Sequence, residues 1–115
     1  MAQLTELLTK EDLEKAWDMS KEKPVLLFKQ STTCPISAEA FKQYNAFIDE
    51  TDLDVGTYFV KVRETRELSN QIAEETGIQH QSPQIFLVKD KQVLWNTSHS
   101  SITQGAIKEA LTNEG

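Results

Sequence analysis

The feature that most constrains the fold of this chain is a continuous apolar run, Val25-Leu26-Leu27-Phe28. Strands that are buried on both faces have such runs, whereas strands with one solvated face alternate apolar and polar residues. The segment before the run, from Thr9 to Trp17, has acidic residues in its first turn and apolar residues on one face, and Lys23-Pro24 ends it. The sequence therefore predicts a helix followed by the central strand of an α/β sheet.

Strand and helix patterns alternate through the rest of the chain. Apolar residues recur at spacings of three and four between Phe41 and Ile48, which predicts a long helix that begins at Cys34. β-Branched and aromatic residues predict a strand over 57–62, and a short helix over 68–76 ends at Gly77. Strands over 84–89 and 92–96 flank the polar pair Asp90-Lys91 and predict an antiparallel hairpin.

A short edge strand over 4–8 and a last helix over 103–111 complete the predicted elements. Strands joined by helices are parallel, and the hairpin adds antiparallel strands, so we expect a mixed sheet with helices on both faces. At 115 residues and 38% hydrophobic composition, with no internal repeat or linker, the chain fits one domain over 1–115.

Charge and hydropathy exclude several classes of partner. The net charge of −6 disfavours binding to phosphate backbones, so nucleic acid is not an expected partner. The apolar runs are too short to span a bilayer, and the first residues lack the basic and apolar segments of a signal peptide. We therefore expect a cytoplasmic protein with no membrane partner.

Cys34 is the only cysteine of the sequence. It can form neither an internal disulfide nor a Cys-x-x-Cys pair, and with only His80 and His99 beside it no metal site is predicted. A lone intracellular cysteine is often a small buried apolar residue. Here, however, it follows a buried strand and starts a helix, where backbone N–H groups and the helix dipole stabilise a thiolate. We therefore predict that Cys34 is a redox nucleophile.

The residues around Cys34 suit such a turn. Pro35 fits the first position of a helix, because its missing N–H has no acceptor there. Ser37 stands where a two-cysteine turn has its second sulfur, and Ile36 lies between them. The hydroxyls of Ser37 and Thr33 have two alternative roles, a hydrogen bond to the thiolate or one to nearby backbone.

Ser82-Pro83 opens the later apolar strand and is the second candidate element of the site. Pro83 either begins the strand in the ordinary trans form, or a cis bond turns the backbone of Ser82 outward. An extended thiol ligand then pairs with Ser82 as a strand does.

The Thr-Cys-Pro-Ile-Ser motif of Thr33 to Ser37, together with His80-Gln81-Ser82-Pro83-Gln84, resembles the monothiol bacilliredoxins, a thioredoxin-like family. The resemblance covers nearly the whole chain. Thioredoxins have two cysteines in this turn, and monothiol glutaredoxins of the iron–sulfur type have Cys-Gly-Phe-Ser. The resemblance implies a thioredoxin-like fold, a cis Pro83, and an enzyme whose Cys34 takes bacillithiol from modified client proteins. Bacillithiol is then a co-substrate, and no cofactor is tightly bound.

Bacillithiol carries carboxylates, so cationic or donor groups are expected near Cys34. Arg63 and Arg66 follow a strand end on the same side of the sheet, although solvated charges near the start of the next helix are the simpler explanation of both. His80 either forms a local hydrogen bond or gives a proton to a leaving thiolate.

Two other functions remain open at the level of the sequence. The first is a redox-inert thioredoxin-like module that holds an extended peptide in the groove beside Cys34. The second is an iron–sulfur carrier in which two chains share a cluster through Cys34 and a soluble thiol.

Overall fold

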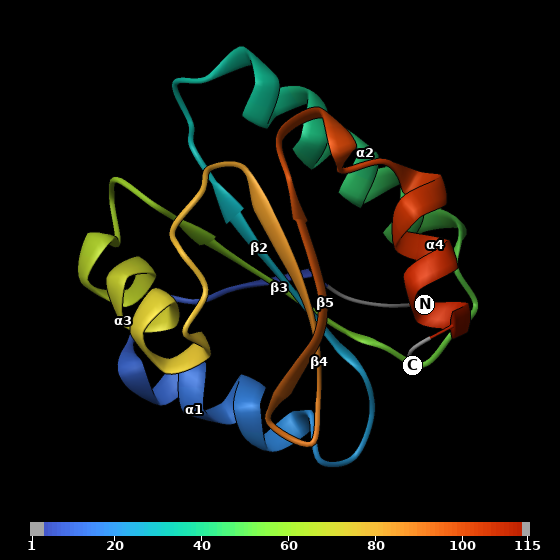
Figure 1. Ribbon diagram of the computed structural model, residues 1–115, viewed down its shortest axis with the longest axis horizontal. Coiled ribbons are helices and arrows are strands. Elements are labelled where there is room, and N and C mark those ends of the chain that lie inside the picture. The colour runs from blue at the N-terminus through green and yellow to red at the C-terminus, as the bar shows by residue number, and fades with distance from the viewer. Residues whose placement is uncertain (1–3, 114–115) are drawn as a thin grey trace.

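The apolar run forms β2 (Val25–Gln30), the central strand of a five-stranded sheet with the order β1-β3-β2-β4-β5 (Figure 1). The computed structural model describes residues 4–113. β2 pairs in parallel with β3 (Gly56–Lys61), which pairs in parallel with the edge strand β1 (Leu4–Glu6). On its other side β2 pairs antiparallel with β4 (Gln84–Lys89), the first strand of the hairpin with β5 (Gln92–Ser98). The predicted mixed α/β sheet is confirmed.

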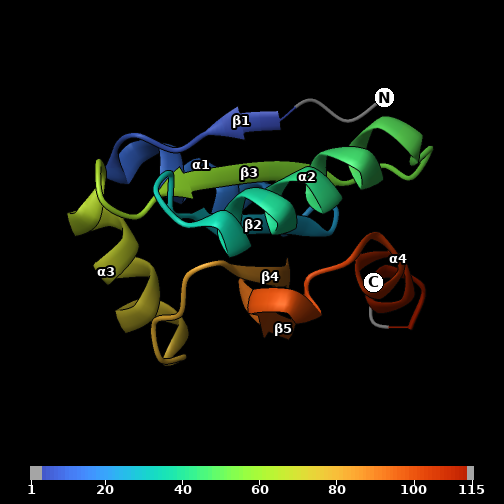
Figure 2. The same ribbon diagram turned by 90° about the horizontal axis from the view of Figure 1, so that it is seen from above.

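Helices cover both faces of this sheet, as predicted (Figure 2). α1 (Lys10–Met19) and α3 (Arg66–Thr76) lie on one face, and α2 (Pro35–Glu50) and α4 (Gln104–Asn113) lie on the other. A short 3₁₀ turn, η1 (His99–Ser101), leads from β5 toward α4. None of the helices over residues 4–113 has the length and apolar character needed to cross a membrane.

β2 is buried on both faces because its alternate side chains enter two separate cores. Leu26 and Phe28 pack in the core beneath α2 and α4. Val25 and Leu27 pack in the core beneath α1 and α3. All four side chains are fully buried, which explains why the run shows no polar alternation.

Local hydrogen bonds and backbone conformations end the elements near the predicted positions. Thr9 Oγ1 accepts from the Asp12 N–H at 3.1 Å, and the Asp12 carboxylate accepts from the N–H groups of Leu8 and Thr9 at 3.0 and 3.2 Å. These backbone hydrogen bonds, the one from Leu8 first, lower the pKa of Asp12. Gly77 ends α3 with a left-handed φ of 69°.

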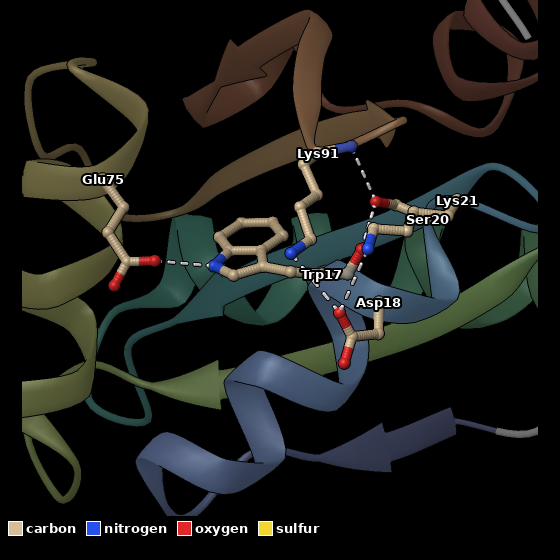
Figure 3. Close-up of polar contacts among 6 residues, drawn as sticks. All are labelled: Trp17, Asp18, Ser20, Lys21, Glu75 and Lys91. Carbon is tan, nitrogen blue, oxygen red and sulfur yellow. Dashed lines mark hydrogen bonds and ion pairs between the residues drawn. The ribbon is translucent and has the colours of Figure 1, made fainter.

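The hairpin turn is formed without glycine. Asp90 and Lys91 both have left-handed φ values, 53° and 63°, as a two-residue hairpin turn requires. Figure 3 shows contacts that hold this turn: the Lys91 N–H donates to Ser20 Oγ at 2.9 Å, and Lys91 Nζ lies 3.4 Å from the Asp18 carboxylate. The end of α1 therefore stabilises a turn whose left-handed backbone conformation is unfavourable for Asp90 and Lys91.

Tyr44 fixes α2 against the sheet. Its ring stacks on Phe28 with centroids 5.3 Å apart, and its hydroxyl accepts from the Tyr58 N–H at 3.1 Å. The same hydroxyl lies 3.2 Å from the carbonyl oxygen of Leu26. Burial raises the pKa of Tyr44, so the phenol stays protonated and able to donate. These bonds hold α2, and hence the residues at its N-terminus, in one position over β2 and β3.

Candidate active site

Cys34 lies between the end of β2 and the start of α2. The helix begins at Pro35, one residue later than predicted, and Cys34 is its N-cap with an extended backbone (φ −107°, ψ 122°). The Cys34 carbonyl accepts the first helical hydrogen bond, from the Ala38 N–H at 3.0 Å. The partly exposed thiol therefore lies at the positive end of a 16-residue helix whose first turn has no acidic residue.

Ser37 takes the backbone-binding role that was one of its two alternatives. Its side chain is fully buried, and its Oγ accepts from the Ser31 N–H at 2.8 Å. This bond ties the first turn of α2 to the segment that leaves β2. Ile36, by contrast, is 50% exposed and gives the surface beside Cys34 an apolar residue.

The loop after β3 contacts the residues before Cys34. Arg63 Nη1 donates to Thr33 Oγ1 at 3.4 Å, and Thr32 Oγ1 donates to the Glu64 carboxylate at 3.0 Å. β2 and β3 run in parallel, so their C-terminal ends meet at one edge of the sheet. The structure thus brings Arg63 to the turn that contains Cys34. Thr33 Oγ1 accepts from this guanidinium, which is neither of the two roles predicted for its hydroxyl.

The Ser82-Pro83 bond is cis, as the family resemblance implied. Pro83 is buried, and its carbonyl accepts from the His99 N–H at 3.0 Å. Because Gln84 pairs antiparallel with Lys29, the start of β4 lies at the same sheet edge as the end of β2. Ser82 Oγ is buried, and no hydrogen bond joins it to any residue within 4–113.

His80 forms its hydrogen bond with a residue that the sequence analysis missed, fifty-one positions away, so this bond is not the local one that was predicted within its own loop. Its Nδ1 lies 3.1 Å from Nζ of Lys29, a fully buried residue of β2. Burial lowers the pKa of Lys29 to about 8. Burial, followed by the charges of Lys29 and Arg66, lowers the pKa of His80. Arg66 therefore lies close enough to act on His80, and Arg63 is the arginine that contacts the cysteine turn.

One sequence signal pointed to Lys29. It directly follows the buried run Val25–Phe28 and precedes the turn, and this place in the strand could have indicated its burial, although we did not predict it. Its partner was not predictable, because fifty-one positions separate the two side chains.

Comparisons with known proteins agree with this geometry. The sequence model of the family described as monothiol bacilliredoxin BrxC matches residues 5–107. A solved structure described as a candidate oxidoreductase with a thioredoxin fold has 34% sequence identity and a TM-score of 0.82, and the match covers 93% of this chain and 92% of that one.

Thioredoxins are similar in fold at lower sequence identity. That of Malassezia sympodialis is 20% identical with a TM-score of 0.77, over 99% of this chain and 92% of that one. That of Fasciola hepatica is 18% identical with the same TM-score, over 96% of this chain and 99% of that one.

The mixed sheet, the cysteine at a helix start and the adjacent cis-proline loop define a thiol oxidoreductase of the thioredoxin fold. Within that class, the chain belongs to the monothiol bacilliredoxin family. A redox function follows from this membership, which favours the enzyme over the redox-inert binding module.

Proposed function

We propose that this protein removes bacillithiol from S-bacillithiolated client proteins in the cytoplasm by thiol–disulfide exchange at Cys34. The observation that carries the proposal is a lone cysteine at the N-cap of α2 in a chain of the monothiol bacilliredoxin family. A helix N-terminus stabilises a thiolate, the form of cysteine that attacks disulfides.

The exchange balances without an external oxidant or reductant. The Cys34 thiolate attacks the bacillithiol sulfur of the client's mixed disulfide. A new S–S bond joins Cys34 to bacillithiol while the bond between bacillithiol and the client breaks. The electron pair of the broken bond leaves with the client cysteine, which takes a proton from water. One disulfide has replaced another, and the client is reduced.

Release of bacillithiol from Cys34 requires an external thiol. Ser37 has no sulfur and the chain has no second cysteine. The thiolate of a second low-molecular-weight thiol attacks the bacillithiol sulfur, forms a small disulfide and returns Cys34 as thiolate. Bacillithiol is therefore a co-substrate and is not retained as a cofactor.

The neighbouring residues support binding of an extended, anionic thiol. The Ser82-Pro83 bond is cis, and we expect the backbone of Ser82 to pair with the ligand as a strand does. The buried Oγ of Ser82 has no hydrogen-bond partner within residues 4–113. Arg63 supplies a guanidinium beside the turn, which suits the carboxylates of bacillithiol. Pro35 and Ile36 shape the exposed surface next to the thiol.

Intact-mass spectrometry tests the proposal. The wild-type protein is mixed with a bacillithiol-modified client, and we expect one bacillithiol adduct on the protein together with the unmodified client. Cys34→Ser is expected to form no adduct and to leave the client modified. Parallel reactions with a glutathione-modified client measure the preference for bacillithiol. Transfer by Cys34→Ser at the wild-type rate, or no transfer by the wild type, would contradict the proposal.

A further inference from the structure

Lys29 is buried in the central strand without a balancing carboxylate. Its residue exposure is 0%, and within residues 4–113 no ion pair joins it to an acidic side chain. Its contacts are His80 Nδ1, 3.1 Å from Nζ, and the ring of Phe86, whose centroid lies 5.8 Å away. A buried ammonium is costly in an apolar core, and neither the imidazole nor the ring carries a compensating negative charge.

The contact with Lys29 determines which nitrogen of the neutral His80 ring carries the proton. An ammonium group has three donors and no acceptor, so Nδ1 of His80 must be the acceptor. The neutral ring then carries its proton on Nε2. Burial first, and then the positive charges of Lys29 from β2 and Arg66 from α3, lower the pKa of His80, which favours the neutral ring at pH 7. Lys29, with its pKa of about 8, remains mostly protonated there.

A second buried polar side chain holds the same segment. Gln84, 1% exposed, is the β4 partner of Lys29 across the β2–β4 pair. Its Oε1 accepts from the Gln81 N–H at 3.2 Å, and its Nε2 donates to the Gln79 carbonyl at 3.3 Å. The cross-strand pair of Lys29 and Gln84 therefore binds three consecutive residues, 79–81, that lead directly into Ser82-Pro83.

We propose that Lys29 is a positioning residue for thiol exchange, whose ammonium fixes the His80 ring and, with Gln84, holds the 79–83 loop where it receives the disulfide. This role rests on the proposed function, because the loop must bind the disulfide that Cys34 attacks. Lys29 itself touches no reacting atom. It acts through His80, so its loss should impair binding and alignment of the disulfide but leave the intrinsic reactivity of the thiol unchanged.

Lys29→Met tests the role, because methionine keeps an unbranched side chain of similar length and removes the positive charge. Small misplacements of reacting groups cost up to about a hundredfold in rate, so we expect exchange with a bacillithiol-modified client to slow by roughly tenfold or more. Alkylation of Cys34 by iodoacetamide should stay within about twofold of wild type. Lys89→Met, at the far end of β4, is the matched control and should exchange at the wild-type rate.

Two further measurements separate positioning from other roles. The ¹⁵N chemical shifts of His80 should show the Nε2–H tautomer in the wild type and a tautomer mixture in Lys29→Met. His80→Gln keeps an oxygen acceptor for Lys29 and cannot act as an acid near neutral pH. It should retain most of the exchange rate, whereas His80→Leu should not.

The outcomes distinguish this inference from the proposed function. Wild-type exchange rates in Lys29→Met, or a wild-type His80 with its proton on Nδ1, would refute the positioning role alone. Slow exchange by His80→Gln equal to that of His80→Leu would also refute it and assign His80 as the proton donor. A wild-type protein that exchanges with neither a bacillithiol- nor a glutathione-modified client would refute both.

Discussion

Ser37 is the residue at which a one-thiol turn differs from a two-thiol turn. Its Oγ is occupied by the Ser31 N–H, so the serine has a structural task besides leaving the turn without a second sulfur. Positions 34 and 37 are about one helical turn apart, within the range that a disulfide bridges. The chemistry of the turn therefore depends on the atom at a single position.

Ser37→Cys is expected to convert the proposed mechanism. The bacillithiol adduct on Cys34 should become short-lived, because the new thiol displaces bacillithiol and forms an internal disulfide. Intact mass after reaction with a bacillithiol-modified client measures the loss of the adduct and the loss of two hydrogens. Ser37→Ala is the control: it removes the hydroxyl without adding sulfur and should keep a stable adduct. A persistent adduct on Ser37→Cys would argue against attack within the turn.

At the scale of elements, the ends of the helices follow local backbone rules. Gly77 ends α3 at a φ of 69°, a conformation that costs other residues about 1 kcal/mol or more, and nothing lies within 4 Å of an added Cβ. Gly105 lies in the first turn of α4, and an added Cβ there also meets nothing within 4 Å. The two positions differ in backbone conformation and not in available space.

Alanine at these two glycines should therefore have opposite effects. Gly77→Ala is expected to lower the free energy of unfolding by roughly 1–2 kcal/mol, since alanine must adopt the left-handed conformation. Gly105→Ala should raise it by up to about 1 kcal/mol, because alanine restricts the unfolded chain and favours the helix. Urea denaturation measures both. Equal effects of the same sign would show that backbone conformation does not control these sites.

At the scale of the whole molecule, the two cores differ in their polar content. The core beneath α2 and α4 contains the Tyr44 hydroxyl, which is hydrogen-bonded to backbone. The Lys29 ammonium lies on the other face of the sheet, where its ring contact is Phe86 of the core beneath α1 and α3. The buried charge therefore links global stability to pH.

Lys29 should make stability rise with pH relative to Lys29→Met. Its pKa falls from 10.5 in the unfolded chain to about 8 in the folded protein, so between these values the unfolded state binds more protons. The difference in unfolding free energy, wild type minus variant, should increase by about 2 to 3 kcal/mol from pH 7 to pH 10. Both proteins retain Tyr44, whose titration cancels. A difference that stays constant with pH would contradict the burial of the ammonium.

The sequence alone determined the order of elements, the mixed sheet and the cysteine turn, because each has a local signal. The run Val25–Phe28 indicated a strand buried on both faces, and Gly77 indicated a helix end. Both signals are local, because the spacing of apolar residues and the position of a glycine can be seen within a few neighbouring residues of the sequence. Only the tertiary structure decided the contacts of Lys29 with His80 and of Arg63 with Thr33. These pairs depend on strand order and register, which bring together side chains that are distant along the chain.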